Sequence, residues 1–154
     1  MNTTKRRIGL VVGTVSVLAL SACGGADRVE LGKVNYEDFT AQQIYERAEF
    51  DLARNNPELA AEVFAEVERL YPYSDLAKRS VIMQAFSHHE AKNYEDSRAS
   101  AQRFIDFYPT DEDAAYAQYL LALSYYDQID EVGRDQKLTF EALQALREVI
   151  ERYP

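Results

Sequence analysis

The sequence predicts an all-α protein, in which three helical hairpins follow an N-terminal leader. Three observations support this fold. The dipeptide Tyr-Pro recurs as Tyr71-Pro72, Tyr108-Pro109 and Tyr153-Pro154, and the residues before each copy align. Apolar residues between the copies are spaced three and four apart, which is the period of one helix face. Only 6 Gly and 4 Pro occur in 154 residues, so the chain has few of the sharp turns that a many-stranded fold requires.

Residues 1–22 are predicted to be a signal peptide. Lys5, Arg6 and Arg7 form a basic n-region, and an apolar h-region runs from Ile8 to Leu20. An h-region of 13 residues is shorter than the about 20 that a membrane-spanning helix needs. The leader ends in Leu20-Ser21-Ala22-Cys23, which resembles the lipobox of bacterial lipoproteins.

Cys23 is the only cysteine and is the predicted lipidation site. The lipobox resemblance implies a covalent S-diacylglycerol and an N-acyl (palmitate) lipid on Cys23, and we expect no other cofactor. Several acyl chains, at about 0.8 kcal/mol per buried CH₂, make a stable anchor. Because Gly24 rather than Asp follows, the resemblance to enteric sorting signals implies the outer membrane. We interpret residues 23–39 as the lipidated cysteine and a flexible tether.

Residues 40–154 are predicted to contain three repeats, over about 40–74, 75–110 and 111–154. Small residues stand twelve positions before each proline (Ala60, Ser97 and Ala142) and thirteen after the first two (Ala85 and Ala122). Ala60 and Phe64 followed by Pro72 match part of the tetratricopeptide pattern. One hairpin cannot cover its own apolar face, so we expect the hairpins to stack into a tetratricopeptide-like solenoid.

Helices are expected over 40–54, 57–71, 75–91, 94–108, 111–127 and 138–152. Thr40 and Gln43 form a capping-box pair, and Pro57 suits the first turn of the second helix. Asn93 is expected to cap the fourth helix, and Thr110 with Asp113 to cap the fifth.

The third hairpin is longer than the second. Pro72 and Pro109 are 37 residues apart, whereas Pro109 and Pro154 are 45 apart. The additional residues fall near 128–137 and predict a long charged loop that contains Arg134 and Asp135. Long loops in compact repeats are often functional, but a tolerated surface insertion explains the length equally well.

The tyrosines are the best candidates for a binding surface. The chain has 11 of them, and a Tyr ring with its hydrogen-bonding tip suits the binding of extended peptides. In this repeat class the first helix of each hairpin lines the concave face. The predicted peptide-binding residues are Tyr45, Tyr71, Tyr73, Phe86, His89, Tyr116, Tyr119 and Tyr126, and the register adds Glu49, Leu52, Ile82 and Leu123. Alternatively, most of these side chains pack between the repeats.

Nucleic-acid binding, metal binding and catalysis are not expected. After the leader, the chain carries 14 basic and 26 acidic residues, without a basic patch. His88-His89-Glu90 lacks the HExxH order and a second ligand at i+4, so we expect His88 to pack within the repeat. Neither a Gly-rich phosphate loop nor a nucleophile motif is present.

The chain resembles the BamD family, a lipoprotein subunit of the machinery that inserts β-barrel proteins into the outer membrane. The stretches 68–72, 101–109 and 134–154 carry the resemblance, with the Arg134-Asp135 segment the most telling. The resemblance covers essentially the whole chain. It implies a periplasm-facing scaffold and receptor for unfolded outer-membrane proteins, in contact with a BamA-like barrel subunit and other Bam lipoproteins. Arg134 and Asp135 would belong to a partner-binding loop.

The chain departs from this family in having fewer repeats. The resemblance implies that the N-terminal repeats receive barrel proteins through a C-terminal signal and that the absent C-terminal repeats dock the POTRA region of BamA. The last helix has apolar residues on more than one side, so we expect Pro154 not to be the natural terminus. These residues are Phe140, Leu143, Leu146, Val149, Ile150 and Tyr153.

Two other kinds of protein fit less well. A pilotin-type tetratricopeptide lipoprotein that assists secretin assembly is the alternative, although its repeats tend to be closer to the standard length. A lipid-anchored hydrolase or solute-binding protein would need a nucleophile motif or an α/β pattern, and neither occurs in the sequence.

Overall fold

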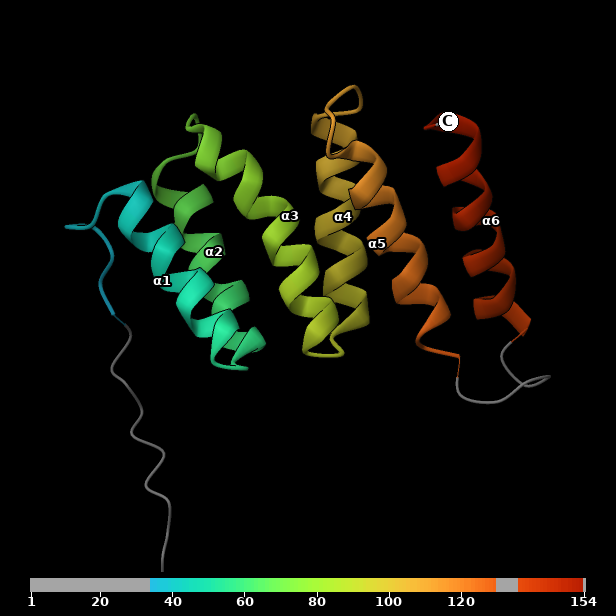
Figure 1. The fold of residues 1–154 in the computed structure, drawn as a ribbon, viewed down its shortest axis with the longest axis horizontal. Coiled ribbons are helices and arrows are strands. Elements are labelled where there is room, and N and C mark those ends of the chain that lie inside the picture. Colours follow the sequence, from blue (N-terminus) through green and yellow to red (C-terminus); the bar gives the residue numbers. More distant parts are fainter. Residues whose placement is uncertain (1–33, 130–135, 154) are drawn as a thin grey trace, which may run out of the picture. The chain divides into compact units, whose positions relative to one another are not determined.

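The computed structural model describes residues 34–129 and 136–153. These residues form six α-helices and no strand. The helices are α1 (Ala41–Ala53), α2 (Pro57–Leu70), α3 (Asp75–Glu90), α4 (Tyr94–Phe107), α5 (Ala114–Tyr126) and α6 (Gln136–Arg152), as Figure 1 shows. The predicted signal peptide, Cys23, and Arg134 and Asp135 of the predicted loop lie outside the described residues.

The helices pack in chain order as the hairpins α1–α2, α3–α4 and α5–α6. Successive hairpins meet where α2 packs on α3 and α4 packs on α5. The first helices of the hairpins also contact one another, α1 with α3 and α3 with α5, whereas in the described part of the chain α2, α4 and α6 do not. The all-α tetratricopeptide-like fold is therefore confirmed. We call the exposed surface of α1, α3 and α5 the A-helix face.

The predicted start of the first helix is confirmed. Thr40 Oγ1 accepts a hydrogen bond from the Gln43 backbone N–H at 3.3 Å, and the Gln43 side chain accepts one from the Thr40 backbone N–H at 2.9 Å. This reciprocal pair is a capping box, which satisfies two N–H groups that the helix leaves free. Pro57 stands at the start of α2, where its missing N–H costs no helical hydrogen bond.

Two other predicted caps are wrong. Asn93 precedes α4, but its side chain makes no capping hydrogen bond. The fifth helix begins at Ala114, and Asp113 rather than Thr110 stands at its N-cap, without a side-chain cap. Asp111 explains the later start: its carboxylate accepts hydrogen bonds from the Asp113 backbone N–H at 3.1 Å and from Lys78 Nζ of α3 at 2.7 Å. A local turn tied to the preceding hairpin replaces the expected first helical turn.

Residues 34–40, which include the end of the predicted tether, form a strap on the first hairpin. Tyr36 packs against the core of that hairpin and lies edge-on to Phe39, with ring centroids 5.9 Å apart. The Tyr71 hydroxyl, at the end of α2, donates a hydrogen bond to the Phe39 carbonyl oxygen. The packing of the half-buried Tyr36 ring and the hydrogen bond from Tyr71 hold the strap against the hairpin.

The described residues bury two hydrophobic clusters. The first lies in the α1–α2 hairpin around Ile44 and Phe64, and the second joins α3, α4, α5 and α6 around Phe104 and Leu120. Small residues at the helix crossings let the helices pack closely. Ala48, Ala85 and Ala122, which stand at equivalent places in the three repeats, are all fully buried.

A buried serine pair joins the second and third hairpins. Ser124 Oγ donates to Ser97 Oγ at 2.8 Å, and Ser97 Oγ donates to the Ala85 carbonyl oxygen at 2.8 Å. Ser87 stands where Ser124 stands in the next repeat, but its buried hydroxyl has no hydrogen-bond partner among the residues that the structure describes. The reason is Ala60, which occupies the place of Ser97 and offers no hydroxyl.

Ala60→Ser should therefore raise the free energy of unfolding, by about 1 kcal/mol. The new hydroxyl would accept from Ser87 and donate to the Ala48 carbonyl, which occupies the place of Ala85. Urea denaturation followed by circular dichroism measures the change. Ala60→Cys, of similar size but a weak hydrogen-bonding group, is the control and should not stabilise. A less stable Ala60→Ser protein would contradict the proposed equivalence.

Candidate peptide-binding face

A row of aromatic side chains runs along the exposed side of α5. Tyr116, Tyr119 and Tyr126 are exposed by 40%, 43% and 59%, and Leu123 lies between them. Their spacing of three and four places them on one stripe of the helix. Burial raises the pKa of Tyr116, and the nearby Tyr119 and Glu90 raise it further. Its protonated hydroxyl can donate a hydrogen bond to a ligand. These three tyrosines are thus accessible, as the predicted peptide-binding role requires.

The predicted residues on α3 are less exposed. Phe86 is half-buried against the second core cluster, and Ile82 is buried. His89 Nε2 lies 3.0 Å from Asp127 Oδ2, just beyond α5, and its ring lies edge-on to Tyr94 at 5.5 Å. His89 therefore links α3 to the end of α5. His88 is half-buried, as expected, and burial lowers its pKa.

Two predicted tyrosines are not free for a ligand. Tyr45 is a core residue, exposed by only 4%, whose ring lies edge-on to Phe64 with centroids 5.2 Å apart. The prediction that Tyr45 lines an open groove is wrong, because Arg79 of α3 covers its ring. Tyr71 is half-buried and its hydroxyl is bound to the strap. Tyr73, in the turn between α2 and α3, is fully exposed.

A pocket of about 730 Å³ extends the aromatic row beyond Tyr126. It lies between the end of α5 and the start of α6 and is mainly apolar. Its lining residues are Tyr126, Asp127, Ile129, Gln136, Thr139, Phe140 and Leu143. The aromatic row and the pocket together give a continuous surface for an apolar ligand.

The structure adds one residue that the sequence analysis missed. Arg79 stands seven residues after Pro72, and Tyr116 stands seven after Pro109. The repeat register alone could therefore have placed Arg79 on the A-helix face.

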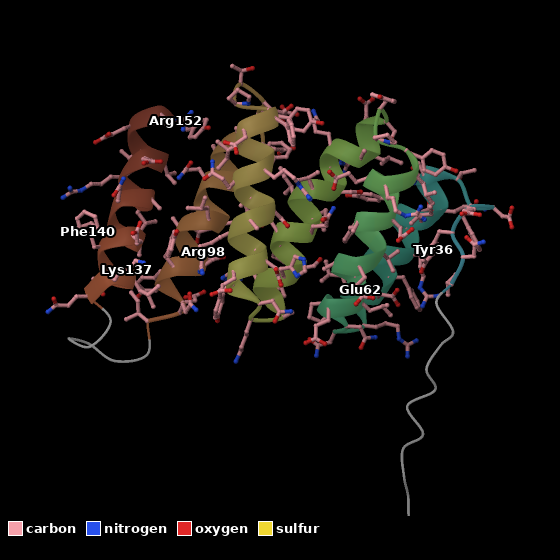
Figure 2. All side chains as sticks on the ribbon, turned by 180° about the vertical axis from the view of Figure 1, so that it is seen from behind. Tyr36, Glu62, Arg98, Lys137, Phe140 and Arg152 are labelled. Carbon is pink, nitrogen blue, oxygen red and sulfur yellow. The ribbon has the colours of Figure 1, made fainter. Side chains whose placement is uncertain are left out.

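The last helix has one buried and one exposed side. Leu146 and Tyr153 pack against the second core cluster. Phe140, Leu143 and Ile150 are exposed by 64%, 48% and 74%, and Phe140 projects from α6 in Figure 2. The expected apolar surface on this helix is confirmed.

Two further findings concern metals and membranes. Within residues 34–129 and 136–153, no three His, Cys, Asp or Glu side chains lie together as metal ligands would. None of the helices in these ranges is both long and apolar enough to cross a membrane.

Stacked helical hairpins, close packing at small residues and contacts between successive first helices define a helical-repeat protein of the tetratricopeptide class. Comparison with known proteins then gives the family. The family model "Outer membrane lipoprotein" (YfiO) matches residues 37–154. The chain belongs to the YfiO family of outer membrane lipoproteins.

Several relatives carry the name outer membrane protein assembly factor BamD. The protein of this name from Caulobacter vibrioides is 38% identical over 90% of this chain, which covers 45% of that protein. The Rickettsia prowazekii protein is 37% identical over 62% of this chain, and the matched region covers 38% of that protein's length. The Neisseria meningitidis serogroup A protein is 28% identical over 92% of this chain and is covered to 57%. The chain thus spans about half the length of these relatives.

Proposed function

We propose that this protein is a subunit of the Bam complex, which assembles and inserts β-barrel proteins in the outer membrane. Its membership of the YfiO family, with relatives named BamD, carries the proposal. Those names describe assembly factors and suggest a non-catalytic scaffold. The partners would be a BamA-like barrel subunit and other Bam lipoproteins. The acylated Cys23 would hold the repeats at the periplasmic side of the membrane, and the loop of Arg134 and Asp135 would contact a partner.

Within this role, the A-helix face would bind unfolded barrel segments. Strands of membrane barrels alternate apolar and polar side chains, so an extended segment presents apolar groups on one side. Tyr116 to Tyr126 covers about 15 Å along α5, which matches four to five extended residues, or roughly two apolar groups on one side. The exposed tyrosines and the adjoining pocket offer apolar contact together with hydroxyl groups for the backbone.

Photocrosslinking in cells tests this function. A photoreactive amino acid at Tyr119 or Tyr126 should capture newly made barrel proteins, and at the half-buried Phe86 it should capture less. Glu62 of α2 and Gln102 of α4, both exposed and outside the A-helix face, are the control positions. Equal capture from the controls would contradict the binding face. Capture of a secretin alone would favour the alternative, a pilotin-type lipoprotein.

A further inference from the structure

The guanidinium group of Arg79 is held on the A-helix face by an aromatic ring. Its central carbon lies over the Tyr45 ring, 5.5 Å from the centroid. Tyr45 is itself fixed, since it is buried and its ring lies edge-on to Phe64. A guanidinium on a ring keeps its N–H groups available at its edge, in the fork that matches a carboxylate.

Arg79 is exposed and, within the described residues, takes part in no ion pair. Its neighbour Lys78 differs, because that side chain is paired with Asp111 at 2.7 Å. Burial raises the pKa of Tyr45. The positive charge of Arg79 lowers that pKa, and the carboxylates of Glu49 and Asp113 raise it. Neither of these two carboxylates forms an ion pair with Arg79.

The surroundings of Arg79 define what it could bind. At the equivalent positions of the three first helices, it is the only Lys or Arg. The other residues there are Gln42, Tyr45, Glu49, Leu52, Ile82, Phe86, His89, Tyr116, Tyr119, Leu123 and Tyr126. Arg47 of α1 is also exposed, but it is paired with Asp51 at 2.7 Å. Arg79 is therefore the unpaired cation beside the exposed tyrosines of α5, which suits a mostly apolar ligand with one carboxylate.

We propose that Arg79 binds a carboxylate of the peptide that occupies the A-helix face and so fixes the position of the peptide along it. The inference rests on the proposed function and specifies the ligand of the same face. The carboxylate would be either the free C-terminus of the segment or an Asp or Glu side chain. Both make the same charge-assisted, two-point hydrogen bonds with a guanidinium.

Fluorescence anisotropy with the full lipidated chain in detergent tests the proposal. The probe is a labelled 12-residue peptide of alternating Phe and Ser that ends in a free carboxylate. A second peptide ends in an amide, and a third has the amide and one internal Glu. The free acid should bind about tenfold more tightly than the amide. Arg79→Gln, which removes the charge but keeps a polar side chain, should remove that difference, and Arg79→Lys should keep part of it.

Arg54→Ala is the matched control, because Arg54 also lies over a ring, that of Phe50 at 5.4 Å, but outside these positions. This variant should bind all three peptides as the unaltered protein does. Tight binding of the third peptide, lost in Arg79→Gln, would identify a side-chain carboxylate as the group bound. If the free-acid and amide peptides bind equally well, and Tyr119→Ala weakens the binding of both, the Arg79 proposal is overturned while the proposed function stands. Failure of every peptide to bind would overturn both.

Discussion

Phe104→Ala should lower the free energy of unfolding by about 3–5 kcal/mol. Phe104 of α4 is fully buried in the cluster that joins α3, α4, α5 and α6, and its ring lies 5.2 Å from that of Tyr108. Removing the ring leaves a cavity between helices that cannot close without moving the neighbouring hairpin. Urea denaturation followed by circular dichroism measures the loss.

Phe107 is the matched control for this substitution. It lies one turn further along α4 but is 70% exposed, so Phe107→Ala should change the stability by no more than about 0.5 kcal/mol. Because the first hairpin has its own core cluster, hydrogen exchange in Phe104→Ala should lose protection in α3 to α5 more than in α1 and α2. Equal costs for the two phenylalanines would mean that α4 does not pack as the structure has it.

Cys23→Ala should abolish lipid attachment and release the protein from the membrane. Cys23 is the only thiol in the chain, so no other residue can form the thioether with diacylglycerol. Without acyl chains, the anchoring free energy of about 0.8 kcal/mol per buried CH₂ is lost. Cell fractionation and intact-protein mass spectrometry should show an unprocessed precursor or a soluble protein without lipid.

Gly25→Ala, two residues after the cysteine, is the control and should remain acylated and membrane-bound. The repeats of Cys23→Ala should still fold and bind peptide in solution, since the clusters described above lie within residues 34–153. Barrel assembly in cells should fail, because the binding face is no longer held at the membrane. A Cys23→Ala protein that stays at the outer membrane without lipid would contradict the anchor.

Features that depend only on residues close together in the chain could be predicted from the sequence. Thr40 and Gln43 lie three residues apart and cap α1 as expected, because a capping box involves only neighbouring backbone groups. The buried alanines at Ala48, Ala85 and Ala122 could be found from the repeat register, since close helix crossings tolerate only small side chains there. The all-α fold follows from such local signals.

The helices, their order and the repeat register thus follow from the sequence, whereas the accessibility of each side chain depends on how the helices pack in three dimensions. Tyr45, Ile82 and Tyr119 stand at equivalent positions of the three repeats, yet they are exposed by 4%, 6% and 43%. Arg79 of α3 covers Tyr45, and Ile82 packs in the cluster that includes α5. Tyr119 differs because, in the described residues, the first helix of a fourth hairpin does not follow to cover α5. The period of a helix fixes the direction of a side chain, but burial depends on which element packs against it. The contact of Arg79 with Tyr45, for example, joins residues 34 positions apart.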